Sequence, residues 1–400
     1  MKLGFIYDAV YPWLKGGGEK TLYELACRLR DRGHECHFFG MQLWDGPVDL
    51  VREGLYYHGL APNVPLYGPD GKRRVGQTLT FARGLLRNLP RYDLASFDLF
   101  DVHAFPFLSF PAFQWVRKRR MPDVPWLLTW LEVWGSDYWR RYLGWKGVVG
   151  TQFERYCAAA APHHLCISPT TGRRLHDLLG VDESRISVIP RGFAPPTISF
   201  TQPRDAHRVV VAGRLLSYKR VGLLLRAWPE VVRAVPDAIL EIIGDGPERA
   251  ALERLAQKLN LGDGVRFVGQ LPEFADVLAK IASAGLLLQP SAREGQSTVV
   301  LEALSVGTPV LAATGAETAV GDFLGPPSIT AAARLDVAAG PDAWSARIIE
   351  LLRDDDLRNR LAAAGRESVA QLGWDDQIAP QIEAMYLRLI SESRSGISGA

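Results

Sequence analysis

The sequence predicts an α/β protein of two domains, each built around a parallel β-sheet. Short apolar runs alternate with amphipathic segments along almost the whole chain, a pattern that is typical of repeated βαβ units. The chain also has 400 residues. That length is too great for one ordinary hydrophobic core and suits two domains of roughly 200 residues each.

The first half opens with a strand, a glycine-rich turn and a helix. The run KLGFIYDAV leads into three glycines within Lys15–Lys20, and the amphipathic segment Lys20–Arg32 follows. Gly33 ends this helix before the strand-like HECHFFG. Weaker repeats appear at FDLFDVHAF, PWLLTWLE, HHLCISPT and RISVIPRGF. We expect a first domain over residues 1–195.

The second half begins after a Pro- and Thr-rich stretch, APPTISFTQPRD, which is typical of a linker. The alternation then restarts with RVVVAGRL, AILEIIGDG, GVRFVGQL, GLLLQPS and TPVLAATG. We expect a second domain over residues 196–373 and an amphipathic helix over 374–400 that packs back toward the first domain. Ligands of such folds bind beyond the carboxyl ends of the strands, which predicts a cleft between the two domains.

The composition of the chain argues against several classes of function. A net charge of +2 argues against a general nucleic-acid binder. There is no run of 18 apolar residues and the chain enters directly into a strand, which argues against a spanning helix or a signal peptide. The four cysteines lack CxxC spacing, so we expect buried reduced thiols and a cytoplasmic protein. They are Cys27, Cys36, Cys157 and Cys166.

Candidate phosphate contacts lie at predicted strand ends. Arg214 follows a strand directly and Lys219 precedes a helix, which suits a diphosphate, although two solvated surface charges fit equally well. Gly244 opens GDGPER, either a ligand-binding turn or a plain helix start with proline at its first position. Gly17 and Gly18 lack the spacing of a dinucleotide fingerprint or a P-loop. They either admit a ligand to the backbone or form a tight turn with positive φ.

The segment SAREGQSTVVLEALSVGTPVLAATG places a turn and a helix, Thr298–Val306, between two apolar runs. Glu294 in the turn is suited to accept hydrogen bonds from sugar hydroxyls. Glu302 lies about two helical turns further on, so the two carboxylates suit opposite sides of a diphosphate. Two unrelated surface glutamates are the alternative, which the apolar surroundings of Glu302 weaken. The backbone N–H groups expected to hold phosphate belong to Gly295, Gln296, Ser297 and Thr298.

The stretch REGQSTVVLEALSVGTPVLA resembles the E-x7-E region of the retaining GT-B glycosyltransferases of family 4. Similar segments are TWLEVWGSDYWRRYLG, ISVIPRGF, GRLLSYKR, GDGPER and GWDDQIAPQIEAMY, so the resemblance covers nearly the whole chain. It implies two Rossmann-like domains with parallel sheets that face each other across a cleft. The C-terminal domain would hold a nucleotide-sugar donor, and the N-terminal domain would bind the acceptor.

The resemblance also implies a role for each candidate residue. Arg214 and Lys219 would bind the diphosphate, Glu294 the sugar and Glu302 the ribose. Fixed cations and helix N–H groups would stabilise the departing diphosphate without a protein nucleophile. The resemblance further implies retention of configuration, with no catalytic metal and no other cofactor. We therefore expect Arg214, Lys219 and Glu294 to be the catalytic residues. The expected donor-binding residues are Gly17, Gly18, Gly244, Gly295, Gln296, Ser297, Thr298 and Glu302.

One position departs from the family pattern. Relatives usually carry a histidine, associated with the donor's 6-hydroxyl, where this chain has Leu131. Either the sugar pocket tolerates the change with Glu132 in its place, or the donor lacks a 6-hydroxyl, or activity is lost. The last case would leave a non-catalytic protein that binds a sugar nucleotide or a partner. The retained cations and carboxylates favour an active hexosyl- or deoxyhexosyltransferase.

The acceptor is predicted only as a class: a glycan, a lipid-linked saccharide or a small molecule. Residues 115–155 carry eight Lys or Arg against four Asp or Glu, with a run of cations between Trp115 and Trp126. Such a surface either contacts anionic lipid, at the inner face of a membrane, or is an ordinary solvated helix end. The cations of the run are Arg117, Lys118, Arg119 and Arg120.

Overall fold

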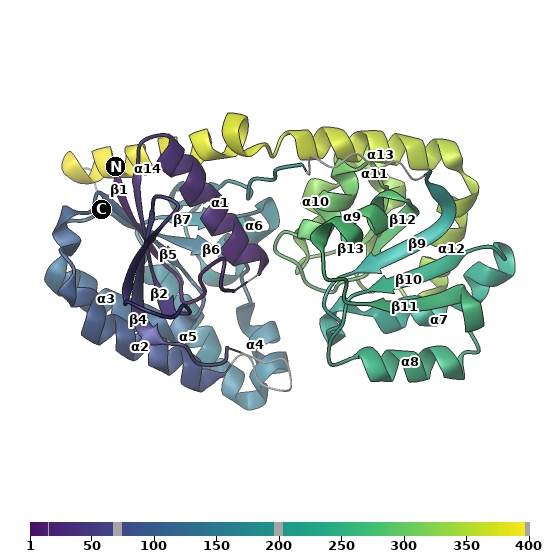
Figure 1. Cartoon of the computed structure of the whole chain (residues 1–400), viewed down its shortest axis with the longest axis horizontal. Coiled ribbons are helices and arrows are strands. Elements are labelled where there is room, and N and C mark those ends of the chain that lie inside the picture. The colour runs from purple at the N-terminus through teal and green to yellow at the C-terminus, as the bar shows by residue number, and fades with distance from the viewer. Residues whose placement is uncertain (15, 67–73, 196–202, 397–400) are drawn as a thin grey trace. The chain divides into compact units, whose positions relative to one another are not determined.

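The computed structural model describes residues 1–14, 16–66, 74–195 and 203–396. These residues cluster into two units, Met1–Gly192 with Trp374–Ala400, and Phe193–Gly373. Each unit holds one sheet of mainly parallel strands with helices packed on it (Figure 1). The predicted α/β class with two parallel-sheet domains is confirmed. Most of the predicted linker lies outside the described residues.

The sheet of the first unit has the strand order β3-β4-β2-β1-β5-β6-β7-β8. Its pairs are parallel except β3 with β4, which form an antiparallel hairpin that the apolar pattern did not predict. The predicted apolar runs of this half all form strands. The strands are β1 (Lys2–Ile6), β2 (Glu35–Gln42), β3 (Asp49–Arg52), β4 (Leu55–Pro62), β5 (Leu99–His103), β6 (Trp126–Trp130), β7 (His164–Cys166) and β8 (Ile186–Val188).

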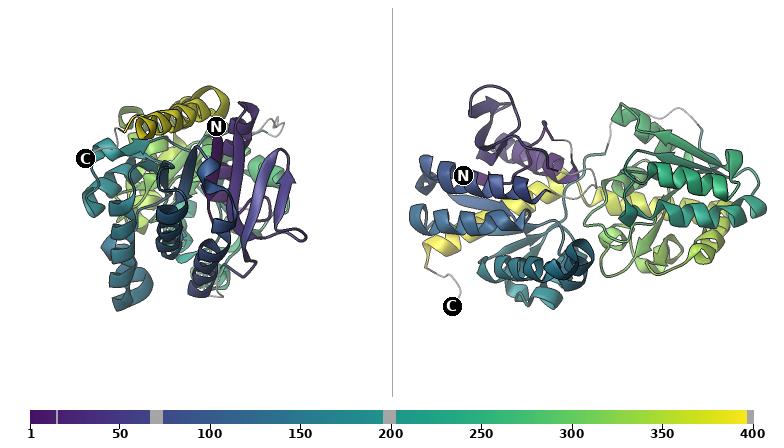
Figure 2. Two further views of the ribbon diagram at one scale, coloured as in Figure 1. Left: turned by 90° about the vertical axis from the view of Figure 1, so that its left-hand side faces the viewer. Right: turned by 90° about the horizontal axis from the view of Figure 1, so that it is seen from below.

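Two helical layers cover this sheet because successive strand residues point to opposite faces. Phe39, Phe100 and Leu128 pack with one group of helices, and Phe5 and Leu127 with the other. Figure 2 (left) shows the two layers on either side of the strands. The first layer is α2 (Val75–Asn88), α3 (Phe110–Arg120), α4 (Gly135–Leu143), α5 (Gly147–Ala160) and α6 (Pro169–Leu179); the second is α1 (Gly17–Asp31) and α14 (Ala379–Arg394).

The sheet of the second unit is parallel in every pair, in the order β11-β10-β9-β12-β13-β14. The five predicted runs form β9 to β13, and β14 is an additional edge strand. The strands are β9 (Asp205–Ala212), β10 (Ile239–Ile243), β11 (Val265–Gly269), β12 (Ala284–Gln289), β13 (Val310–Thr314) and β14 (Arg334–Asp336). The helices are α7 (Val221–Ala234), α8 (Arg249–Lys258), α9 (Phe274–Ala282), α10 (Thr298–Ser305), α11 (Pro327–Thr330), α12 (Pro341–Arg353) and α13 (Asp355–Ala370).

Two helix starts differ from the sequence prediction. Helix α1 begins at Gly17, so Gly17 and Gly18 lie in its first turn and neither has a positive φ. Of the two alternatives for these glycines, the tight turn with positive φ is therefore wrong. Helix α8 begins at Arg249, and Pro247 precedes it in a turn instead of occupying its first position. Helix α10 ends at Ser305, one residue before the predicted end.

The C-terminal segment packs on the first unit. A π-helical turn, Trp374–Ile378, leads into α14, whose apolar side chains join the core formed with α1. Trp374 Nε1 donates to Glu24 at 2.6 Å, and its ring lies where a Cβ on Gly192 would stand. Tyr386 reaches through to β5 and donates its hydroxyl to the buried Asp101 at 2.6 Å. These contacts tie the end of the chain to its first 192 residues.

The four cysteines are free thiols. Cys36, Cys157 and Cys166 are buried, as predicted, whereas Cys27 is only half-buried. Among the described helices, none is long and apolar enough to cross a membrane.

Candidate active site

The loops that follow β9 and β10 meet at the carboxyl edge of the second sheet. Arg214, on the exposed turn after β9, lies between two residues whose backbone contacts fix this turn. The Leu215 N–H donates to the Asp245 carbonyl at 2.8 Å. Gly244 has a φ of +124°, and a Cβ there would lie 2.1 Å from the Gly213 carbonyl oxygen. Only glycine fits this position, so the two loops are held close.

Lys219 and Glu294 form an ion pair at the same edge. Lys219 ends the 3₁₀ turn Ser217–Lys219, and its Nζ lies 2.5 Å from Glu294 Oε1. Their side chains are 19% and 12% exposed, so solvent screens this pair less than it screens a surface pair. The Ala292 N–H also donates to the Tyr218 carbonyl at 2.8 Å, which joins the two loops through the backbone. The structure thus brings together a cation and a carboxylate that are 75 residues apart.

Gln289 is a site residue that the sequence reasoning missed. It ends β12, is 2% exposed, and donates Nε2 to Glu294 Oε1 at 2.8 Å and to Ser297 Oγ at 3.1 Å. Glu294 Oε1 therefore receives hydrogen bonds from both an ammonium and an amide, which hold its carboxylate in one orientation. The available signal was a single amide at the end of the otherwise apolar run GLLLQP.

Helix α10 begins at Thr298, four residues after Glu294. Ser297 is its N-cap residue, and Gly295, Gln296 and Ser297 are buried, while Thr298 is exposed. The first N–H groups of a helix have no acceptor within the helix, which makes this end suited to an anion. Glu302 is half-buried on α10 beside fully buried apolar neighbours.

In the first unit, Gly18 and Leu131 lie against each other. Leu131 follows β6, and its Cδ1 is 3.0 Å from where a Cβ on Gly18 would stand, with the Tyr7 hydroxyl at 3.5 Å. Gly18 is therefore explained by close packing and not by backbone conformation. Both residues line a cavity of about 40 Å³ together with Asp101 and His103.

Asp101 and His103 are fully buried titratable groups of β5. Asp101 accepts hydrogen bonds from Thr129 Oγ1 at 2.5 Å and from Tyr386, yet burial raises its pKa to about 6. Burial, together with the nearby charge of Arg191, lowers the pKa of His103 to about 3. The imidazole is therefore neutral at neutral pH.

The turn after Leu131 is held by a buried carboxylate. Glu154 on α5 accepts hydrogen bonds from the Trp134 N–H at 2.6 Å, the Gly135 N–H at 2.8 Å and Trp139 Nε1 at 3.0 Å. Burial raises the pKa of Glu154, while these three donors act against the rise. Glu132 is half-buried at the start of this turn. The turn therefore has a defined path beside the Leu131 position.

The predicted site residues fall into two groups, one in each unit. Gly18 and Leu131 are in contact in the first unit, with Gly17 and Glu132 adjacent to them in the chain. In the parts of the chain that the structure describes, no group of three or more His, Cys, Asp or Glu side chains is arranged to hold a metal ion. The second unit holds Arg214, Lys219, Gly244, Glu294, Gly295, Gln296, Ser297, Thr298 and Glu302.

Comparison with known protein families shows which family the chain belongs to. A family model described as glycosyl transferases group 1 matches residues 199–368, and one described as glycosyltransferase family 4 matches residues 15–195. The chain is a group 1 glycosyltransferase. It is an enzyme that transfers a sugar, as its sequence pattern indicated.

Relatives of this glycosyltransferase extend over most of its length. It is 26% identical to the N-acetyl-alpha-D-glucosaminyl L-malate synthase of Bacillus anthracis, over 96% of this chain and 97% of the relative. It is 27% identical to the D-inositol 3-phosphate glycosyltransferase of Thermomonospora curvata, over 92% and 90%. The sucrose-phosphate synthase of Thermosynechococcus elongatus has the same GT-B fold, with a TM-score of 0.75 at 21% identity over 98% and 99% of the two chains.

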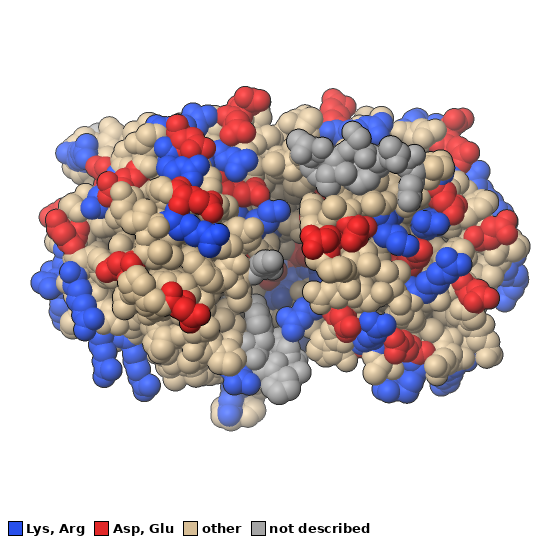
Figure 3. Space-filling model, in the orientation of Figure 1, with Lys and Arg blue, Asp and Glu red and all other residues tan. Residues whose placement is uncertain are grey.

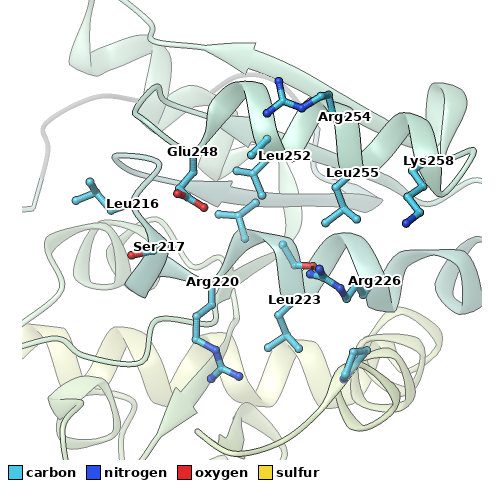
Figure 4. A pocket seen from close by; sticks show the side chains of 14 residues that line it. Leu216, Ser217, Arg220, Leu223, Arg226, Glu248, Leu252, Arg254, Leu255 and Lys258 are labelled. Carbon is cyan, nitrogen blue, oxygen red and sulfur yellow. Dashed lines mark hydrogen bonds between the residues drawn. The ribbon is translucent and has the colours of Figure 1, made fainter. Parts of the chain in front are cut away.

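A separate groove of the glycosyltransferase lies between α7 and α8 and has a volume of about 660 Å³. Figure 4 shows leucine side chains from both helices along it, with Arg226, Arg254 and Lys258 around them. Arg220 also lines the groove and donates to the Val337 carbonyl at 2.5 Å. Since Arg214, Lys219 and Glu294 are not among its lining residues, this groove is distinct from the donor-site candidates.

Proposed function

We propose that the enzyme transfers a sugar from a nucleoside-diphosphate donor to an acceptor hydroxyl, with retention of configuration and without a metal. The observation that carries this proposal is the cluster of Lys219, Glu294 and Gln289 beside the start of α10. A diphosphate needs fixed positive charge, and a sugar needs a fixed hydrogen-bond acceptor. This cluster offers both within one ion pair.

Solved structures of the same fold support a nucleotide-sugar donor. The Anabaena protein HepE, in complex with UDP and glucose, matches this chain with a TM-score of 0.69 at 17% identity over 96% and 99% of the chains. Another structure of HepE is a complex with UDP-glucose. Since the two chains share this fold, we propose that this chain also binds its donor beyond the carboxyl ends of parallel strands, where ligands of α/β proteins bind.

The proposed step uses the second unit's residues as follows. The bond from the anomeric carbon to the β-phosphate oxygen breaks, and the acceptor oxygen bonds to that carbon on the same face. The acceptor proton leaves with the departing phosphate. Arg214 and Lys219 stabilise the negative charge that develops on the phosphate, together with the N–H groups at the start of α10. An ammonium has three N–H donors, so Lys219 can bind phosphate while it keeps Glu294 in place.

Glu294 positions the sugar, and Glu302 the ribose, in this proposal. Gln289 keeps the Glu294 carboxylate oriented before the donor arrives, so less ordering remains when the sugar binds. Gly244 and Gly213 let the donor approach the backbone at the ends of β9 and β10. The roles of Gln289, Glu294 and Glu302 predict a defect in donor use and not in folding.

The acceptor is proposed to bind the first unit, next to the sugar pocket proposed for Leu131 and Glu132. Two relatives are named for L-malate and D-inositol 3-phosphate. For this chain we propose an acceptor hydroxyl on a glycan, a lipid-linked saccharide or a small molecule. A non-catalytic protein is not favoured, because the matching family models and the relatives just described are transferases.

A donor screen tests the proposal. We expect one of the UDP-, GDP- or dTDP-sugars, with EDTA present throughout, to raise the unfolding temperature. A ligand at 100 times its Kd adds about 2.7 kcal/mol to stability. The same donor should then be hydrolysed slowly without acceptor, and NMR of the released sugar should show the donor's anomeric configuration first. Inversion, or a requirement for added metal, would contradict the corresponding part of the proposal.

A further inference from the structure

The two helical layers of the first unit differ in charge. Helices α2, α3, α4 and α5, with the 3₁₀ turn Gly144–Lys146, carry ten Lys or Arg and two Asp or Glu within the described residues. Helices α1 and α14, on the opposite face of the sheet, carry five of each. These four helices and the turn therefore carry a net charge of about +8 in a chain whose total charge is +2. We call the outer face of α2–α5 the basic layer.

Of the two acidic residues on these helices, one lies at the surface and the other is buried. Glu154 is buried and occupied by the turn after β6, so Asp137 is the one exposed acid on these helices. Figure 3 shows Lys and Arg side chains that project from the lower left margin, where Figure 1 labels α2 and α3. The exposed cations are Arg83, Arg87, Lys118, Arg119, Arg120, Arg140, Arg141, Lys146 and Arg155.

Large apolar side chains are exposed on the same layer. Trp145 is 82% exposed, and Val148 and Val149 beside it are more than half exposed. A folded chain rarely leaves several such side chains together in water without a partner. The exposed apolar residues of the basic layer are Val75, Leu79, Leu86, Trp115, Leu143, Trp145, Val148, Val149 and Tyr156.

The exposed apolar and cationic residues follow the outward helix faces. On α2, Leu79, Arg83, Leu86 and Arg87 recur at three- to four-residue spacing, which places them on one side of the helix. The inward side of α2 supplies Phe81 to the core. The helix is therefore apolar on its inner face and mixed apolar and cationic on its outer face.

Helix α5 repeats this arrangement. Val148, Val149, Arg155 and Tyr156 are exposed at helical spacing, and Cys157 is among the side chains it buries in the core. A surface that only faced water would need no apolar residues among its cations. Two helices of this layer with the same outward pattern indicate a surface that contacts something both anionic and apolar.

Cations lie beside the exposed tryptophans of this layer. The Arg119 guanidinium is 4.1 Å from the centre of the Trp115 ring, and Lys146 Nζ is 5.7 Å from the Trp145 ring. Tryptophan and tyrosine favour the boundary between lipid headgroups and acyl chains, while Lys and Arg bind anionic headgroups. Each pair therefore combines, within one contact, a group that favours lipid headgroups with one that favours the boundary to the acyl chains.

We propose that the basic layer binds the surface of a bilayer that contains anionic phospholipid. The cations would bind lipid phosphates, and Trp145 with Val148 and Val149 would insert among the headgroups. Nucleic acid and anionic polysaccharide satisfy the charge but offer no apolar medium for two exposed valines. For the acceptor, this inference favours the lipid-linked class, a point that rests on the proposed function.

The test is co-sedimentation with vesicles of phosphatidylcholine alone or mixed with phosphatidylglycerol, without donor or acceptor. We expect binding to the mixed vesicles only, weakened by salt because salt screens exposed charges. Replacement of Lys118, Arg119 and Arg120 by Gln should lower the vesicle affinity by about 10²-fold, since each cation near an anionic surface contributes roughly fivefold. A second variant, Trp145→Ser with Val149→Ser, should lose the binding that persists at high salt.

A matched control removes three exposed cations of the second unit, Arg233, Arg254 and Lys258, by the same change to Gln. It alters the net charge equally, so its vesicle binding should equal that of the parent. Unfolding temperature and donor hydrolysis, measured on all variants, separate loss of binding from loss of folding or of the donor site. Equal binding to neutral vesicles, equal loss in the control, or binding to heparin but to no vesicle would each overturn the proposal.

Discussion

The carboxyl edges of the two sheets carry different kinds of side chain, charged in the second unit and apolar in the first. In the second unit this edge holds charged groups in partnership, with Lys219 2.5 Å from Glu294. In the first unit the corresponding edge presents Leu131 packed on Gly18, above a buried carboxyl and a neutral imidazole. Both edges follow parallel strands, so the difference comes from side chains alone. The fold supplies the position, and the residues at the strand ends supply the function.

Removal of the second unit's cations should have the largest effect. We expect Arg214→Ala and Lys219→Ala each to lower transfer by about 10²-fold or more, because each removes a preorganised charge that stabilises the leaving diphosphate. Steady-state kinetics with the donor found by screening measure this loss. Arg226→Ala, an exposed cation of the same unit, is the control and should keep the parental rate. Parental rates in both single variants would show that the donor site lies elsewhere.

The buried carboxyl of the first unit should appear as a pH dependence of stability. The folded-state pKa of Asp101, about 6, exceeds the ordinary value near 4. Because the pKa is raised in the folded state, Asp101 adds to the free energy of unfolding when it is protonated. This contribution is fully present below about pH 4 and is lost as the pH rises through about 6, where the buried carboxyl must ionise. Two pKa units correspond to about 3 kcal/mol.

Asp101→Asn isolates this contribution, since the amide oxygen can accept from one of the two hydroxyls, Thr129 or Tyr386, and the amide nitrogen can donate to the other once that hydroxyl turns. Denaturant unfolding from pH 4 to 8 should show the variant gaining stability relative to the parent by about 3 kcal/mol across that window. As a control, Asp356→Asn, at an exposed position, should differ from the parent in free energy of unfolding by a nearly constant amount over the same pH range. A parent-to-variant difference for Asp101→Asn that did not change with pH would contradict a buried, protonated carboxyl.

The apolar edge of the first unit predicts donor preference. If Leu131 faces carbon 6 of the sugar, the parent should prefer a 6-deoxy sugar or a pentose over the hexose by at most about 10²-fold, since an apolar pocket rejects a hydroxyl weakly. Leu131→His should shift the preference toward the hexose, and Leu131→Met should keep it. Competition between two donors that share one nucleotide measures the ratio. A parent that uses the hexose more efficiently would refute this role.

The smallest expected effect concerns the orientation of the paired carboxylate. Gln289→Met removes both hydrogen bonds from the amide while it keeps similar volume, and should lower kcat by about tenfold with little change in unfolding temperature. Gln289→Glu should be slower at pH 8 and recover at lower pH, when a protonated carboxyl donates again. The pH–rate profiles of parent and variants provide the measurement. Identical profiles would leave Gln289 with a packing role only.

Local periodicity allowed much of the fold to be predicted. Apolar runs such as GLLLQP and TPVLAATG form β12 and β13, because a strand buried on both faces needs continuous apolar sequence. The β3–β4 hairpin escaped prediction because β3 has four residues and is mostly exposed at the edge of its sheet, and because His58 and Gly59 interrupt the apolar run of β4. The start of α1 was placed late because glycines argue against a helix locally, whereas packing against Leu131 favours them here.

The sequence by itself determined the α/β class, the strand order along the chain, and the motifs that indicated a glycosyltransferase. These depend on residues close together in the chain, where spacing carries the information. Only the tertiary structure showed which side chains meet: Lys219 with Glu294, Tyr386 with Asp101, and Gly18 with Leu131. Partners up to 285 residues apart have no common local pattern. Their pairing, and the collection of cations from four helices on one face, arise only when the sheets form and the helices pack on them.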